Sequence, residues 1–158
     1  MAEPTKPKKV IQSGSQTFTP TETNIDTTLN IVEKIKKTIG GLNNLQAYPI
    51  RELVKHAEEF GPYLKQQRLE TNQIRKFLDA VNRLKADLGE KDDFSKIETG
   101  VVLLKPKLAY AAARQKAAKP LGDVMSAAID KVGSKEDFAR LVQLIESIIA
   151  YHKAEGGK

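Results

Sequence analysis

Five cations and no carboxylate lie in the segment 105–119, which reads KPKLAYAAARQKAAK. The nearest acids in the sequence are Glu98 and Asp123. We therefore expect that the surroundings do not offset this positive charge, and uncompensated cations attract phosphates. The segment indicates a polyanion-binding surface whose basic side chains are those of Lys105, Lys107, Arg114, Lys116 and Lys119.

The spacing of three residues in this segment predicts a cationic helical face. Lys107, Tyr110 and Arg114 lie at i, i+3 and i+7, so a helix would place them on one side. Two cations beside an aromatic ring suit a phosphate backbone with a base or sugar next to it. Tyr110 is open to two interpretations, a core aromatic or a stacking platform, and we expect the core.

A second basic cluster precedes the first and is made of Arg75, Lys76 and Arg83. Lys76 and Arg83 share a helical face at i and i+7, which favours a nucleic-acid contact. Arg75 could instead pair with Asp79 along its own helix, an interaction worth only about 0.2–0.5 kcal/mol. Our hypothesis is that the two cationic helices converge in the fold into one anion-binding trough that includes Arg75 and Arg114.

The residues that would support catalysis or metal binding are few. The chain has no cysteine and two histidines, His56 and His152, which excludes thiolate chemistry and disulfides. Neither histidine has a local partner motif, so we interpret both as structural or surface residues. Asp92 and Asp93 are expected to cap a helix. We predict no catalytic residue, no metal ligand and no cofactor.

Composition and charge indicate a basic intracellular protein. The 158 residues carry a formal net charge of +6 and a pI near 9.4, which favours polyanionic partners. The first residues lack the apolar segment of a secretory signal, and no apolar run approaches the roughly 20 residues that span a bilayer. We expect a soluble, cytoplasmic protein without a membrane contact.

The chain divides into an N-terminal arm and one folded domain. Residues 1–24 are rich in proline, lysine and small polar residues and hold few large apolar side chains. They cannot bury enough surface to offset chain entropy, so we predict a disordered arm. Its lysines permit RNA contact, but a solvated tail is the favoured interpretation. Residues 25–158 form the predicted domain.

Apolar residues in this domain recur with helical spacing, and none alternate with period two over a useful length. One stripe holds Ile50, Leu53, Val54 and Ala57. Thr71 is expected to cap one helix, and Ser134 with Asp137 forms a capping box for another. The pattern predicts an all-α fold, a compact bundle of five to six helices. Breaks or kinks are expected at Gly40-Gly41, Gly61-Pro62, Gly89, Pro106 and Pro120.

Three stretches of the sequence carry a resemblance to a known family. They are TNQIRKFLDAVNRLKA at 71–86, LLKPKLAYAAARQ at 103–115 and FARLVQLIESIIAYHKAEGG at 138–157. In order and spacing, the chain resembles the small subunit of type III-A CRISPR effector (Csm) complexes through about residues 45–158.

The resemblance implies a non-catalytic, all-helical subunit of an antiviral ribonucleoprotein, with no cofactor. Several neighbouring copies would line the groove that holds the guide RNA–target RNA duplex, beside the backbone and large subunits that carry the catalytic activities. By position, Arg75, Lys76, Lys107 and Arg114 become candidate contacts to the RNA backbone. The charge pattern of the sequence adds three more candidate RNA contacts, Arg83, Lys105 and Lys116.

A structural adaptor is the alternative hypothesis. In that case the basic faces would bind acidic partner proteins, and the alanine-rich stretch 109–118 would be a protein docking surface. Release of the chain from its native complex by RNase separates the two hypotheses.

Overall fold

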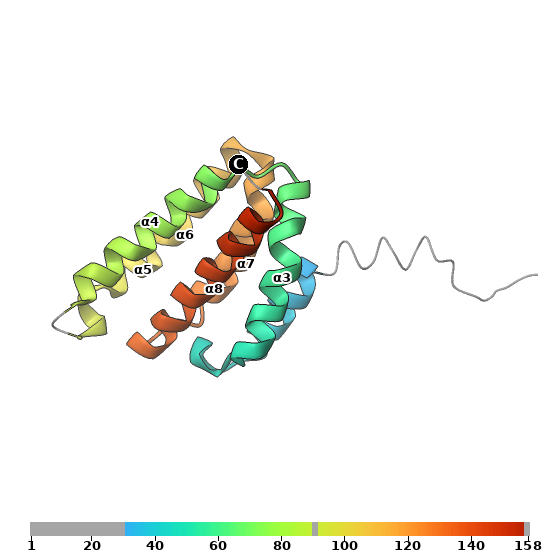
Figure 1. Cartoon of the computed structure of the whole chain (residues 1–158). Coiled ribbons are helices and arrows are strands. Elements are labelled where there is room, and N and C mark those ends of the chain that lie inside the picture. Colours follow the sequence, from blue (N-terminus) through green and yellow to red (C-terminus); the bar gives the residue numbers. More distant parts are fainter. Residues whose placement is uncertain (1–30, 90–91, 157–158) are drawn as a thin grey trace, which may run out of the picture. The chain divides into compact units, whose positions relative to one another are not determined.

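The computed structural model describes residues 31–89 and 92–156 (Figure 1). Within these ranges the secondary structure is helical and no strand occurs, which confirms the all-α prediction. The predicted arm, 1–24, lies outside the described residues. After a helix over 31–40, the elements are η3 (Leu45–Ala47), α3 (Ile50–Gln66), α4 (Thr71–Leu88), η5 (Phe94–Lys96), α5 (Glu98–Val102), α6 (Leu104–Arg114), η6 (Lys116–Ala118), α7 (Lys119–Ile129) and α8 (Lys135–Ala154).

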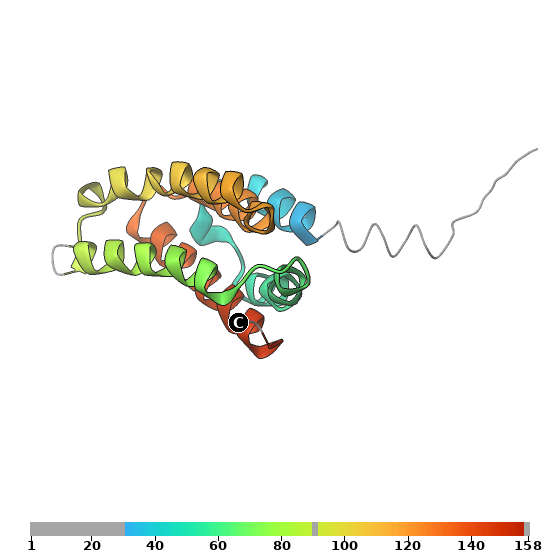
Figure 2. The same ribbon diagram turned by 90° about the horizontal axis from the view of Figure 1, so that it is seen from above.

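Helix α8 organises the bundle, because α3, α4 and η3 all pack against it, while α6 packs against α7. Fully buried side chains of α8, such as Leu141, Leu144 and Ile148, join those of α3 and α4 in one core. Viewed from above, α4 and the rod formed by α5 and α6 run alongside each other (Figure 2). None of the helices in the described ranges is long and apolar enough to cross a membrane.

A break or a kink was predicted at Gly61-Pro62, and the break is wrong, because α3 continues through both residues to Gln66. Gly61 instead lies where α3 contacts the backbone of α8. A Cβ added to it would lie 2.6 Å from the backbone nitrogen of His152 and 2.8 Å from the carbonyl carbon of Tyr151. The glycine therefore permits the close approach of the α3 and α8 backbones.

Thr71 was predicted to be the N-cap of α4, and this prediction is wrong. Thr71 is the first residue of the helix, and Glu70 occupies the cap position. The Thr71 hydroxyl instead lies 3.3 Å from Nδ1 of the buried His152, whose Nε2 lies 2.6 Å from the Leu69 carbonyl oxygen. A carbonyl oxygen only accepts, so Nε2 donates to it and Nδ1 accepts from the hydroxyl. The histidine thus fastens the α3–α4 connection to the end of α8.

The Ser134 half of the capping box predicted at the start of α8 is confirmed. The Ser134 hydroxyl accepts a hydrogen bond from the Asp137 backbone N–H at 3.1 Å. The buried Asp137 carboxylate accepts from the backbone N–H groups of Gln46 at 2.8 Å and Gly133 at 3.0 Å. One carboxylate therefore satisfies donors from two segments and joins η3 to α8.

Pro106 does not interrupt a long helix, because the segment is already divided before it: α5 ends at Val102 and α6 begins at Leu104. The proline occupies the first turn of α6, where its missing N–H leaves no intrahelical hydrogen bond unmade. The break expected at Pro106 therefore lies at Leu103, three residues before the proline. The stripe predicted on α3 is only partly buried: Leu53 and Ala57 lie in the core, whereas Ile50 and Val54 lie at its edge and are exposed.

The contact between Tyr48 and His56 should make the stability of the protein depend on pH. The Tyr48 hydroxyl lies 2.7 Å from His56 Nδ1, and burial lowers the pKa of His56 below its ordinary value of 6.5. As the pH falls below 6.5, the unfolded chain binds a proton before the folded one does, so the free energy of unfolding decreases. We expect the variant His56→Gln to lose less stability than the wild type between pH 7 and about pH 5 in urea titrations. Parallel curves for the two proteins would contradict this assignment.

Candidate nucleic-acid interface

Helices α4 and α6 each place one of the predicted lysines, Lys76 and Lys107, on a shared cavity of about 190 Å³. Both side chains belong to exposed residues and mark the edge that faces solvent. The other lining residues are mostly apolar: Leu69, Gln73, Phe77, Ala80, Leu104, Leu108, Ala111, Ala118 and Leu121. The lining therefore holds two cations and no carboxylate.

The two helices build the cavity with the same residue spacing. Helix α4 contributes Gln73, Lys76, Phe77 and Ala80, and α6 contributes Leu104, Lys107, Leu108 and Ala111. Each set lies at i, i+3, i+4 and i+7, which is one face of a helix. In both sets a lysine reaches the rim, a large apolar residue forms the wall, and an alanine ends the set. The alanines leave space that larger side chains would fill.

The remaining predicted residues lie outside this lining. Arg75 and Arg83 are exposed on α4, and Lys116 is exposed in η6. In the part of the chain that the structure describes, no ion pair joins Arg75 to Asp79, so the local pairing considered for this residue is not formed. The structure brings Lys76 and Lys107 together at one cavity, and neither Arg75 nor Arg114, which the predicted trough included, lines it.

Tyr110 was expected in the core, and this expectation is wrong. Its side chain is 64% exposed. The Arg114 guanidinium carbon lies 5.7 Å from the centre of the ring, and its Nη1 is 3.4 Å from the hydroxyl oxygen. The position i+3 from Lys107 points away from the packed side of α6, so the ring forms an exposed cation–π pair with Arg114 at the end of that helix.

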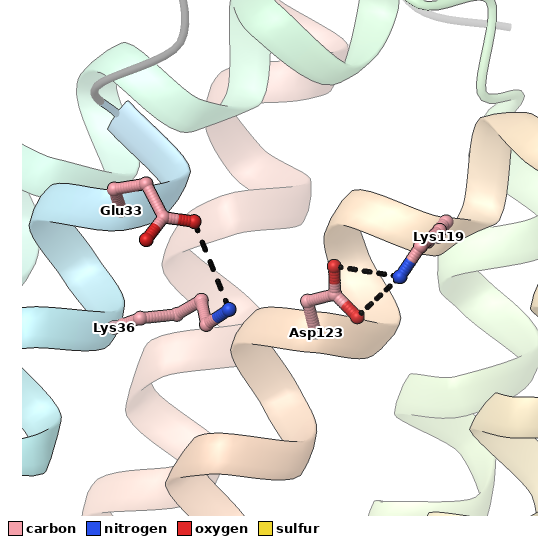
Figure 3. Close-up of polar contacts among 4 residues, drawn as sticks. All are labelled: Glu33, Lys36, Lys119 and Asp123. Carbon is pink, nitrogen blue, oxygen red and sulfur yellow. Dashed lines mark hydrogen bonds and ion pairs between the residues drawn. The ribbon is translucent and has the colours of Figure 1, made fainter.

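The expectation that no acid offsets the charge of the segment 105–119 is also wrong for two of its lysines. Lys105 forms an ion pair with Asp130, which follows α7. Lys119 contacts both carboxylate oxygens of Asp123 at 3.1 Å, one turn further along α7 (Figure 3). Asp130 lies 25 residues from Lys105 in sequence, so the sequence analysis did not identify it as a partner; the fold brings the two side chains together.

A neighbouring side of α6 forms a second groove, with α7, and Leu108 lines both. Small residues line it, and its charged groups include an acid as well as two lysines. The lining consists of Lys105, Leu108, Ala109, Ala112, Ala113, Lys119, Gly122, Asp123 and Ser126. This groove is therefore closer to neutral than the cavity between α4 and α6.

Gln73, Phe77, Ala80 and Ala111 belong to the cavity, and the sequence analysis did not identify them as site residues. The signal that could have found them is the matched spacing around Lys76 and Lys107, with an alanine in the same place on both helices.

The carboxylates near α5 have structural contacts. Asp93 caps η5 by accepting a hydrogen bond from the Ser95 backbone N–H at 3.1 Å, as predicted. Asp92 forms an ion pair with Lys135 at the start of α8. Across residues 31–89 and 92–156, no group of three or more histidine, cysteine or acidic residues is arranged to hold a metal ion.

Within the described residues, the protein is all-helical, with two lysines at one cavity between two helices. The comparison with protein families makes the assignment: the Csm2 Type III-A family matches residues 47–158, and the chain belongs to that family. It is therefore a small subunit of the type III-A CRISPR effector complex, and the other Csm subunits are its partners. No curated protein and no solved structure matches the chain.

Proposed function

We propose that this subunit holds RNA by its backbone on the face between α4 and α6, within the groove of the guide–target duplex. The observation that carries the proposal is the convergence of Lys76 and Lys107 on one cavity whose lining contains no carboxylate. Their helices are separated in sequence, so the fold alone brings these charges together. Two fixed cations on helices can position a phosphate backbone without reading base identity.

Arg75, Arg83, Arg114 and Lys116 extend the proposed surface as exposed flanking cations. Lys105 is expected to contribute less, because Asp130 already pairs with it. The subunit is proposed to be non-catalytic and to act in the cytoplasm with several copies of itself. Each copy would make few contacts, so stable retention of RNA would depend on many copies acting together.

The salt dependence of RNA binding tests this proposal on the purified protein. We expect weak binding without sequence preference, with the logarithm of the association constant falling against the logarithm of salt concentration. The two lysine–phosphate contacts contribute about −1.4 to this slope, from roughly −0.7 per contact on a single strand, and contacts by the flanking cations make it steeper. Fluorescence anisotropy at several salt concentrations measures the slope. A slope near zero would contradict the proposal.

A protein adaptor is the second candidate, favoured by the groove of small residues between α6 and α7. Ala109, Ala112 and Ala113 would let a partner helix approach closely. RNase treatment of the native complex separates the candidates, because release of this subunit indicates an RNA tether and retention indicates protein contacts.

A further inference from the structure

The cavity between α4 and α6 is suited to more than phosphate. Its walls are apolar, and Phe77 contributes an aromatic ring that is 7% exposed. The polar lining groups are the two lysines at the edge and the Gln73 amide. A phosphate on Lys76 or Lys107 would leave this apolar space beside it unfilled.

We infer that the cavity receives one nucleobase of the bound RNA while the neighbouring phosphates lie on Lys76 and Lys107. This inference rests on the proposed function and adds a base-binding subsite to it. Bases of single-stranded RNA segments can leave the stack and lie against aromatic side chains. The ring of Phe77 supplies the stacking surface, and the Gln73 amide can both donate to and accept from a base edge.

Size and charge favour this occupant over an acyl chain or a peptide. The volume of about 190 Å³ is below the roughly 300–1,000 Å³ of pockets that enclose drug-sized ligands, so it suits a single ring system. The ligand must also carry negative charge next to its apolar part, because both charged lining residues are lysines. A nucleotide joins these two features in one unit.

The subsite is predicted to be tolerant of base identity. Stacking on an aromatic ring is available to every base, and one amide at the rim gives little discrimination. We expect removal of the base, rather than its exchange for another base, to weaken binding.

Cavity filling tests the inference on the full chain. The variant Ala111→Leu would place a larger side chain in the cavity, and Ala154→Leu makes the same change at an exposed position at the end of α8, outside the cavity lining. Affinity would be measured for an RNA oligonucleotide and for the same ribose-phosphate chain without bases. We expect Ala111→Leu to weaken binding of the base-bearing RNA about tenfold, with little change for the abasic chain. Ala154→Leu should leave both affinities unchanged.

A second variant keeps the test independent of folding defects in the first. Phe77→Leu preserves an apolar wall and removes the stacking ring, and circular dichroism checks the helices of each protein. A fluorescent purine in the oligonucleotide should change its emission on binding to the wild type and change it less with Phe77→Leu. Equal affinity for base-bearing and abasic RNA in the wild type would overturn the inference. If charge reversal at Lys76 and Lys107 still weakens binding, the proposed function stands; if it has no effect, both fall.

Discussion

Replacing Gly61 with alanine is expected to lower the free energy of unfolding by about 2–3 kcal/mol. The new Cβ would lie 2.6 Å from one backbone atom of α8 and 2.8 Å from another. Backbone atoms cannot rotate away as a side chain can, so α3 and α8 must move apart. Alanine favours an interior helix position over glycine by about 1 kcal/mol. The variant is less stable than the wild type because the steric cost exceeds this gain.

Gly40→Ala is the matched control. Gly40 ends the helix over 31–40, and a Cβ at this position would meet no atom within 4 Å. We expect its stability to equal or slightly exceed that of the wild type. Urea denaturation followed by circular dichroism compares the three proteins. Wild-type stability of Gly61→Ala would show that the two helices do not approach as closely as described.

Reversing the charge of Lys76 and Lys107 together is expected to weaken RNA binding at least about tenfold at low salt, or about 1.4 kcal/mol. The double variant replaces two attractive contacts with two repulsive ones at the same site. The slope of the salt dependence should become shallower by about 1.4. Both residues are exposed, so the helical circular dichroism signal should stay the same.

The control for this variant is Lys36→Glu with Lys37→Glu, which changes the net charge equally. Lys36 pairs with Glu33 on its own helix at 3.7 Å (Figure 3), and neither Lys36 nor Lys37 lines the cavity. We expect this control to retain much more affinity than the cavity variant. Equal losses in the two would show that RNA responds to net charge alone and that the face between α4 and α6 has no special role.

The sequence predicts the helices of this chain better than it predicts their ends. Apolar periodicity and the glycine after Leu88 locate α4, and the Ser134 cap locates α8, because these signals act within a few residues. Gly61 was misinterpreted as a break because the need for a glycine there comes from the α8 backbone, which lies about ninety residues away in sequence. Thr71 was misinterpreted as a cap because its partner, His152, lies 81 residues away in sequence.

The candidate site shows the same limit. The sequence singles out Lys76 and Lys107 as cations, and the fold places both at one cavity. It gives no sign that Asp130 pairs with Lys105, because nothing local connects them. The exposure of Tyr110 depends on which side of α6 packs against α7, and the periodicity of an alanine-rich helix leaves that side undefined.

Photo-crosslinking in the assembled complex tests the central claim most directly. Target RNA carrying 4-thiouridine would be bound by the complex and irradiated, and mass spectrometry would identify the crosslinked residues of this subunit. The account predicts crosslinks within 73–83 and 104–114, on the facing sides of α4 and α6. Crosslinks confined to the exposed side of α3 around Ile50 and Val54, or none in this subunit, would contradict it.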